Sequence, residues 1–129
     1  MSRDHRKLRV FQISDELVID VYAWTRGLPS DERFGLISQI RRAAVSVPTN
    51  IVEGSARQST RDSLHFITIA LASASETRYL VSLASRLHAG LTGTVDIESR
   101  YNDLIRAIQG LLNAFEPGAC SPDPVAFQK

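Results

Sequence analysis

Apolar residues recur every three or four positions along four successive segments of the chain. This spacing places them on one side of an α-helix. The stripes are Val10, Ile13, Leu17, Val21, Trp24 and Leu28; Ile37, Ile40, Ala44, Val47 and Ile51; a broader set between Leu64 and Leu87; and Ile97, Tyr101, Leu104, Ile108, Leu111 and Phe115. No segment shows the alternation of apolar and polar residues, with a period of two, that is typical of a β-strand. The pattern therefore predicts helices over residues 10–27, 30–58, 60–88 and 95–115.

Polar residues at the starts of these segments indicate where helices begin. Ser30, Ser59 and Thr94 are the expected N-caps of the second, third and fourth helices, because short hydroxyl side chains accept hydrogen bonds from free N–H groups. The connections are short, so neighbouring helices should be antiparallel. The sequence predicts one all-α domain over residues 1–129. It is an antiparallel up-down-up-down four-helix bundle with an irregular, Pro/Gly-containing C-terminal tail over residues 116–129.

The second predicted helix contains a proline. Pro48 removes one backbone hydrogen bond and should kink the helix. Ser46, Thr49 and Asn50 lie around it and can bond the carbonyls that it frees. The kink either fits the helix to the bundle, which we favour, or aims the turn over residues 50–57 outward.

The second and third helices carry more apolar surface than a four-helix core needs. Beside the core stripe of the second helix lies a flank formed by Phe34, Val45, Pro48 and Val52, with Arg41 among them. Such a broad apolar arc indicates burial on two sides. One explanation is contact between subunits, and the other is a wide contact with both neighbouring helices. On the first explanation, the oligomer interface includes Phe34, Arg41, Val45 and Val52.

Positive charge is concentrated in two segments of a chain whose net charge is only +1. Residues 33–61 hold five arginines and one glutamate, so their local charge is 5 − 1 = +4. Residues 3–9 hold four basic residues and one aspartate, which gives 4 − 1 = +3. This concentration favours a polyanionic partner such as RNA or DNA.

On a helical wheel, one polar face of the second helix lies opposite the core. Arg42 and Arg57, with Arg61 nearby, could bind phosphates, and Asn50 could add a hydrogen bond. Glu53 and Arg57 also form an i,i+4 pair, which is the expected pattern of a solvated salt bridge. The candidate nucleic-acid or partner-binding residues are Arg42, Asn50, Glu53, Arg57 and Arg61. No base-stacking aromatic is expected here, so recognition should follow backbone and shape.

The sequence offers no catalytic or metal-binding motif. A di-iron bundle needs two Glu-x-x-His motifs, whereas this chain has only Asp62-x-x-His65, with His65 expected to be exposed. We predict no enzyme activity, cofactor or metal.

The apolar runs are too short to span a membrane. The lone Cys120 and a basic N-terminus without an apolar segment behind it are typical of a cytoplasmic protein. Arg78 should pair with an acid on another helix or subunit.

The segment over residues 33–54 carries an ordered series of residues: Arg33-Phe34-Gly35-Leu36, Ser38-Gln39, Arg41-Arg42-Ala43-Ala44-Val45-Ser46, Asn50-Ile51 and Glu53-Gly54. This series resembles the four-helix bundle proteins encoded within 23S rRNA intervening sequences, and the likeness extends over roughly residues 10–88. The resemblance implies a helical protomer and a ring-like homo-oligomer, a pentamer, without an established activity.

The accessory variability determinant proteins of diversity-generating retroelements are similar in architecture. They associate with nucleic acid and a reverse transcriptase, so this likeness implies an RNA- or DNA-associated bundle. Two functions remain open at the level of the sequence. The chain is a nucleic-acid-associated oligomer, or it is an oligomeric protein-interaction scaffold that binds no nucleic acid.

Overall fold

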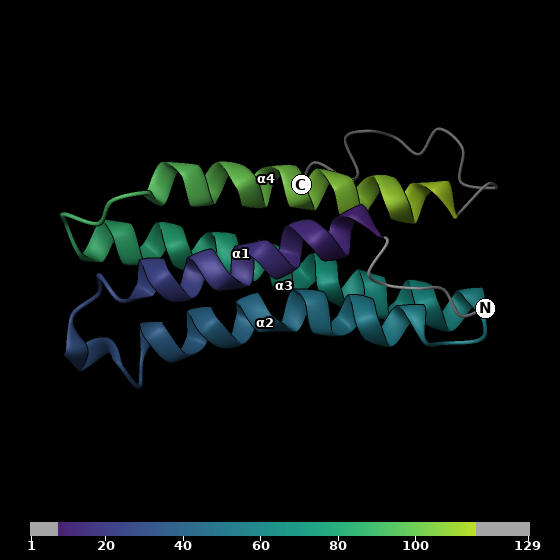
Figure 1. The fold of residues 1–129 in the computed structure, drawn as a ribbon, viewed down its shortest axis with the longest axis horizontal. Coiled ribbons are helices and arrows are strands. Elements are labelled where there is room, and N and C mark those ends of the chain that lie inside the picture. The colour runs from purple at the N-terminus through teal and green to yellow at the C-terminus, as the bar shows by residue number, and fades with distance from the viewer. Residues whose placement is uncertain (1–7, 116–129) are drawn as a thin grey trace.

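Four α-helices form the part of the chain that the structure, a computed structural model, describes, which is residues 8–115. They are α1 (Arg9–Thr25), α2 (Leu36–Ser55), α3 (Thr60–Leu87) and α4 (Thr94–Ala114), and a short 3₁₀ turn, η2 (Ser30–Glu32), precedes α2 (Figure 1). Residues 8–115 contain no β-strand. The predicted all-α class is confirmed.

The helices form an antiparallel bundle in which sequence neighbours are also spatial neighbours. Helix α1 packs on α2 and α4, and α3 packs on the same two helices (Figure 1). The most extensive contact joins α2 to α3. This arrangement is the predicted up-down-up-down bundle.

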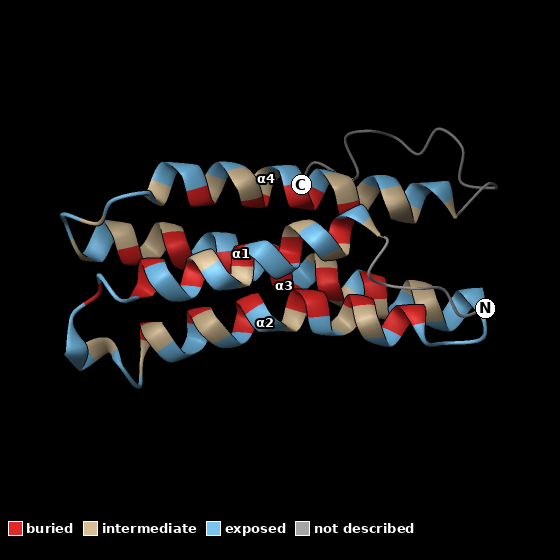
Figure 2. Ribbon diagram, viewed as in Figure 1, coloured by how far each residue is buried: buried red, intermediate tan, exposed pale blue. Residues whose placement is uncertain are grey.

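The predicted apolar stripes meet in the centre of the bundle (Figure 2). Leu17, Ile40, Ile51, Leu104 and Ile108 are fully buried. Burial of a side chain of this size stabilises the fold by about 1.5–3 kcal/mol. Three members of the stripes, Ile13, Ile37 and Leu111, pack on the core while remaining partly exposed.

The broad apolar arc of α3 is largely buried within the same chain. Ile67, Ala74 and Val81 are buried on one side of the helix, and Leu80 and Ala84 on another. Contact with both α2 and α4 therefore accounts for most of this surface. Leu87 remains 60% exposed.

Helix α2 begins at Leu36, so the predicted start at residue 30 is wrong. Ser30 lies in the 3₁₀ turn η2 instead of capping α2, and Gly35 is the N-cap. The cause is Glu32, whose Oε1 accepts a hydrogen bond from the Leu36 N–H at 3.4 Å. A negative charge at this position is favourable because the helix N-terminus is positive. At ~1.5 Å per residue, the 20 residues of α2 span about 30 Å.

The two other predicted caps have different outcomes. Ser59 Oγ accepts from the Asp62 N–H at 3.1 Å, so this cap is confirmed. Helix α4 is capped instead by Gly93, whose φ of 84° is left-handed and suits glycine. Thr94 Oγ1 accepts a hydrogen bond from Trp24 Nε1 at 3.1 Å, so this hydroxyl ties α4 to α1.

Helix α2 runs through Pro48 without a break. Thr49 Oγ1 donates to the Val45 carbonyl at 2.7 Å, and Asn50 Nδ2 donates to the Ser46 carbonyl at 2.8 Å. Pro48 itself is buried, so it does not belong to an exposed flank. These observations fit the interpretation in which the proline adapts α2 to the bundle.

A side-chain hydrogen bond joins η2 to the end of α3. His88 Nε2 lies 2.7 Å from Glu32 Oε2, and both side chains are less than a quarter exposed. The hydrogen bond with His88 lowers the pKa of Glu32 below its ordinary value of 4.5, and the bond from the Leu36 N–H lowers it further. Glu32 therefore stabilises two helix ends while it is ionised.

This lowered pKa predicts a pH-dependent stability. The Glu32 contribution is fully present above pH 4.5 and is lost as the pH falls through the lower folded-state pKa. Glu32→Gln should unfold at a lower urea concentration than wild type at about pH 7, and the difference should shrink towards about pH 3. Glu16→Gln, at an exposed position of α1, is the matched control and should change the midpoint little. A difference that grows in acid would contradict the assignment.

Candidate functional site

Two candidate surfaces lie on α2 and on the turns that flank it. The arginine edge is made of Arg42, Asn50 and Glu53 of α2, Arg57 in the turn after α2 and Arg61 in the first turn of α3. The apolar flank is made of Phe34 in the turn before α2 and of Arg41, Val45 and Val52 of α2. Ser46 Oγ, one turn before Asn50, lies 2.8 Å from Ser73 Oγ of α3, whereas Arg41 of the flank bonds residues of α1.

Four residues of the arginine edge are exposed, and two of these are arginines that differ from Arg57 in their charge pairing. Arg42 on α2 and Arg61 on α3 are exposed, and neither makes an ion pair with another residue of the described range 8–115. Thirteen residues separate Arg42 from Ser55 at the end of α2, which is ~20 Å at ~1.5 Å per residue. That length corresponds to about six nucleotides at ~3.4 Å per nucleotide of duplex.

Asn50 does not project outward as predicted. Its Nδ2 donates to the Ser46 carbonyl at 2.8 Å and lies 3.0 Å from Ser46 Oγ, and the side chain is half-buried. Ser46 in turn bonds Ser73. The amide nitrogen that was predicted to donate to a phosphate therefore supports the α2–α3 contact beside Pro48.

Arg57 lies beside aromatic side chains, contrary to the prediction that this edge holds none. Its guanidinium carbon lies 4.5 Å from the centroid of the Phe66 ring. The rings of Phe66 and His65 meet edge to face, with centroids 5.4 Å apart and planes at 74°. Arg57 Nη2 also pairs with Glu53 Oε1 at 3.3 Å, as the i,i+4 spacing predicted.

A close approach of the two helices explains this clustering. Ser63 Oγ donates to the Gly54 carbonyl at 2.6 Å, and a Cβ at position 54 would lie only 3.0 Å from the Ser63 carbonyl oxygen. The first turns of α3 therefore lie directly against the last turn of α2, which places Phe66 next to Arg57. A glycine near the end of α2, followed by a short turn, was the available sequence signal.

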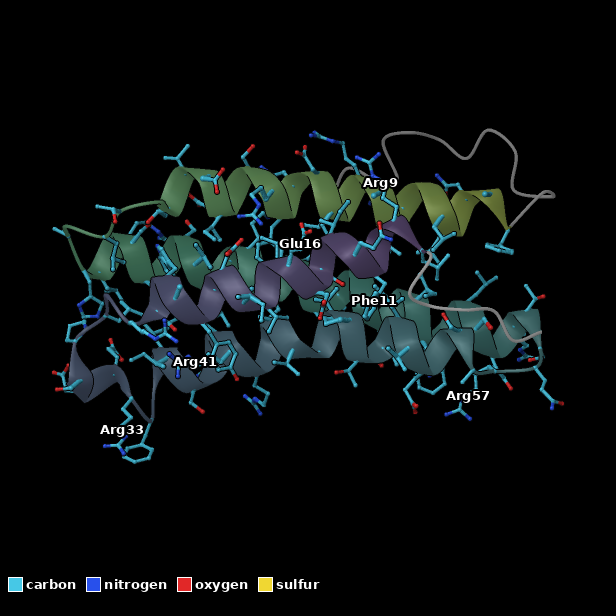
Figure 3. All side chains as sticks on the ribbon, viewed as in Figure 1. Arg9, Phe11, Glu16, Arg33, Arg41 and Arg57 are labelled. Atoms are coloured by element: carbon cyan, nitrogen blue, oxygen red, sulfur yellow. The ribbon has the colours of Figure 1, made fainter. Side chains whose placement is uncertain are left out.

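The apolar flank is open at Phe34 and Val45. Phe34 is 89% exposed, and the Arg33 guanidinium lies 5.4 Å from its ring centroid. Val45 is 38% exposed and Val52 is half-buried. Figure 3 shows Arg33 at one end of the bundle and Arg57 near the other end of α2.

Arg41 is bound within its own chain. Its Nε donates to Thr25 Oγ1 at 2.9 Å, its Nη2 donates to the Tyr22 carbonyl at 3.2 Å, and its guanidinium lies 4.4 Å from the Tyr22 ring centroid. Figure 3 shows Arg41 where α2 passes α1. A cation is favourable here because the C-terminus of α1 is negative. The head group of Arg41 is therefore held by its own chain, and the interface role predicted for this residue stays a prediction.

Two further arginines join α4 to its neighbours. Arg78 Nη1 donates to Asn102 Oδ1 at 2.8 Å, so its partner on α4 is an amide and not the predicted acid. Arg100 bridges Asp20 of α1 at 2.7 Å and Asp96 at 3.3 Å. The Asp20–Arg100 pair was not predicted, because eighty residues separate its members in the sequence.

Residues 8–115 contain no group of three or more His, Cys, Asp or Glu side chains that could hold a metal ion. His65 is exposed, as predicted. No described helix is long and apolar enough to cross a membrane. Cys120 and the basic residues Arg3, Arg6 and Lys7 lie outside the described residues.

Comparison with known proteins decides the family. The model of the 23S rRNA-intervening sequence protein family matches residues 6–113. The chain belongs to this family. The resemblance found in residues 33–54 is thereby confirmed.

A solved relative supports the fold of this intervening-sequence family member. It is a protein of unknown function from the S23 ribosomal protein family of Bacteroides thetaiotaomicron, 23% identical, with a TM-score of 0.73. The alignment covers 81% of this chain and 95% of that one. At this identity the likeness concerns the fold alone. No curated protein matches the chain.

Arg41 and Arg42 are adjacent in the sequence but make different contacts, so replacing each of them should change the free energy of unfolding by a different amount. Arg41→Met removes two hydrogen bonds from a charged donor and should lower the free energy of unfolding by about 1.5–3 kcal/mol. Arg42→Met changes an exposed position and should stay within about 0.5 kcal/mol of wild type. Urea denaturation measures both. Equal destabilisation by the two substitutions would contradict the internal role of Arg41.

Proposed function

We propose that the chain forms a homo-oligomer through the apolar flank and that this oligomer binds the phosphate backbone of RNA or DNA along its arginine edges. The observation that carries the proposal is that the same region exposes apolar side chains, at Phe34 and Val45, and arginines that make no ion pair among the described residues 8–115, at Arg42 and Arg61. In the assembly that we propose, another subunit covers the flank, and Arg42 and Arg61 bind phosphates. The function is binding, and we assign no catalytic step to it.

Exposed apolar residues support association through the α1 side of α2. Phe34 and Val45 are exposed on the flank, and on α1 the exposed large apolar residues are Ile19 at 68% and Tyr22 at 36%; Tyr22 contacts Arg41 of the flank. Large apolar side chains gathered on one region of a surface are typical of an interaction site. The occupant that we propose is a second copy of the chain, in a ring that the family resemblance indicates to be a pentamer.

Repetition of the arginine edge supports nucleic-acid binding. One protomer offers few unpaired arginines, but a ring repeats Arg42 and Arg61 once per subunit. Each phosphate that is neutralised releases counterions, so affinity rises with the number of neutralised phosphates. Arg57 shares its charge with Glu53, so Arg42 and Arg61 should dominate the salt dependence.

The alternative function is an oligomeric scaffold that binds a protein and no nucleic acid. The nearly full exposure of Phe34 favours it, because an aromatic side chain presented to solvent is an effective anchor for another protein. Salt separates the two functions. Binding to phosphates weakens steeply as salt rises, whereas contact with an apolar partner does not.

The assembly can be tested with one charged substitution. Val45→Glu should convert the oligomer to a smaller species while leaving the thermal midpoint of the protomer nearly unchanged, because Val45 is already 38% exposed in the single chain. Val95→Glu, at an 80% exposed position on α4, is the matched control and should leave the assembly intact. Multi-angle light scattering measures the mass. A monomeric wild type at micromolar concentration would refute the proposed assembly.

Nucleic-acid binding can be tested through its dependence on salt. The double substitution Arg42→Ala and Arg61→Ala should weaken binding to all sequences alike. It should also lower the slope of log K against log salt by ~0.7–0.9 for each phosphate that the variant no longer neutralises. Arg106→Ala, at a 73% exposed position on α4, is the control. Filter binding at two salt concentrations measures the slopes. A wild type that retains no nucleic acid at low salt would favour the scaffold.

A further inference from the structure

The arginine edge ends in a small cluster of planar side chains at the turn between α2 and α3. Arg57 lies over the face of Phe66, and His65 meets the same ring edge to face. The Arg57 side chain is 43% exposed, and His65 is also exposed. We call Arg57, Arg61, His65 and Phe66 the stacking cluster.

The ion pair between Glu53 and Arg57 affects which part of a nucleotide the stacking cluster can bind. Glu53 lies 3.3 Å from Arg57 and offsets its charge, so a phosphate gains little by approaching here. The guanidinium nevertheless keeps a planar face, and nucleic-acid bases stack on arginine planes and on aromatic rings. An uncharged base therefore suits the position beside Arg57 better than a phosphate does.

Phosphate contacts are available next to this position. Arg61 and His65 are one turn apart on α3, and residues with this spacing share a face of the helix. Arg61 makes no ion pair among the described residues 8–115. A nucleotide whose base lies on Arg57, beside Phe66 and His65, would thus have the Arg61 cation available for its backbone.

We propose that the stacking cluster holds an unpaired base and that the oligomer consequently selects single-stranded over duplex nucleic acid. The proposal deepens the proposed function and rests on it. In a duplex the bases are stacked on one another and closed to side chains, whereas single strands expose them. The stacking cluster supplies the strand preference, and Arg42 and Arg61 supply the sequence-independent affinity.

Two conservative substitutions remove the planar groups while preserving charge and packing. Phe66→Leu keeps an apolar side chain against α2, and Arg57→Lys keeps the positive charge opposite Glu53. Phe66→Tyr retains the aromatic ring, so this variant should bind single strands about as well as wild type does. Arg106→Lys on α4 is the control for replacing an exposed, ion-paired arginine. Circular dichroism melting confirms that each variant is folded.

The measurement is fluorescence anisotropy of the full-length protein with labelled adenine oligonucleotides of about 12 residues, within the ~4–16-nucleotide range of single-strand sites. The oligonucleotides compared are single-stranded RNA, single-stranded DNA, an abasic single-stranded DNA of equal length and the corresponding duplex. Wild type should bind the single strands better than the abasic strand and the duplex. Phe66→Leu and Arg57→Lys should each weaken single-strand binding about fivefold or more, with unchanged salt slope and unchanged duplex binding.

The outcomes separate the two proposals. If wild type binds single strand, abasic strand and duplex alike, and Phe66→Leu changes none of them, the stacking inference is refuted while the proposed function stands. If wild type binds none of the oligonucleotides at low salt, the proposed function falls, and the stacking inference falls with it. The RNA and DNA arms show which nucleic acid is preferred.

Discussion

The close contact between α2 and α3 at Gly54 determines which side chains meet where these two helices join. A Cβ at that position would lie 3.0 Å from the Ser63 carbonyl oxygen and 3.3 Å from both Ile67 Cδ1 and Phe66 Cβ, so a larger residue would require its neighbours to shift. The Ser63 hydroxyl then bonds the Gly54 carbonyl at 2.6 Å. This close approach places Phe66 beside Arg57.

The opposite side of α2 is fixed by a different interaction. Arg41 bonds the last turn of α1 through Thr25 and the Tyr22 carbonyl. Helix α2 is thus held on both sides, and its remaining surface divides into an arginine edge and an apolar flank. In the assembly that we propose, the apolar flank is covered by another copy of the chain, and Arg42 and Arg61 are presented to a polyanion.

Much of the fold follows from apolar spacing, because helix periodicity dictates which side chains face the core. The spacing alone predicts Leu17, Ile40 and Leu104 in the core, and all three are fully buried. The start of α2 could not be predicted in this way. It depends on Glu32 folding back onto Leu36 and pairing with His88, a residue 56 positions away.

The candidate site was predictable in composition but not in geometry. The exposure of Arg42 follows from the helical wheel. Asn50 shares this polar face on the wheel, yet its amide folds back along the helix and bonds the Ser46 carbonyl and hydroxyl instead. The aromatic partner of Arg57 comes from α3 and is set by the tight turn after Gly54, which no single-helix pattern can show.

Hydroxyl-radical footprinting of the full-length protein, with and without an adenine oligonucleotide, tests the separation of the two surfaces most directly. Phe34 and Tyr22 should be protected in the assembled protein whether or not the oligonucleotide is present. His65 and Phe66 should become protected only when the oligonucleotide is added. Protection of Phe34 and Tyr22 by the oligonucleotide, with His65 and Phe66 unchanged, would contradict this assignment of the two surfaces.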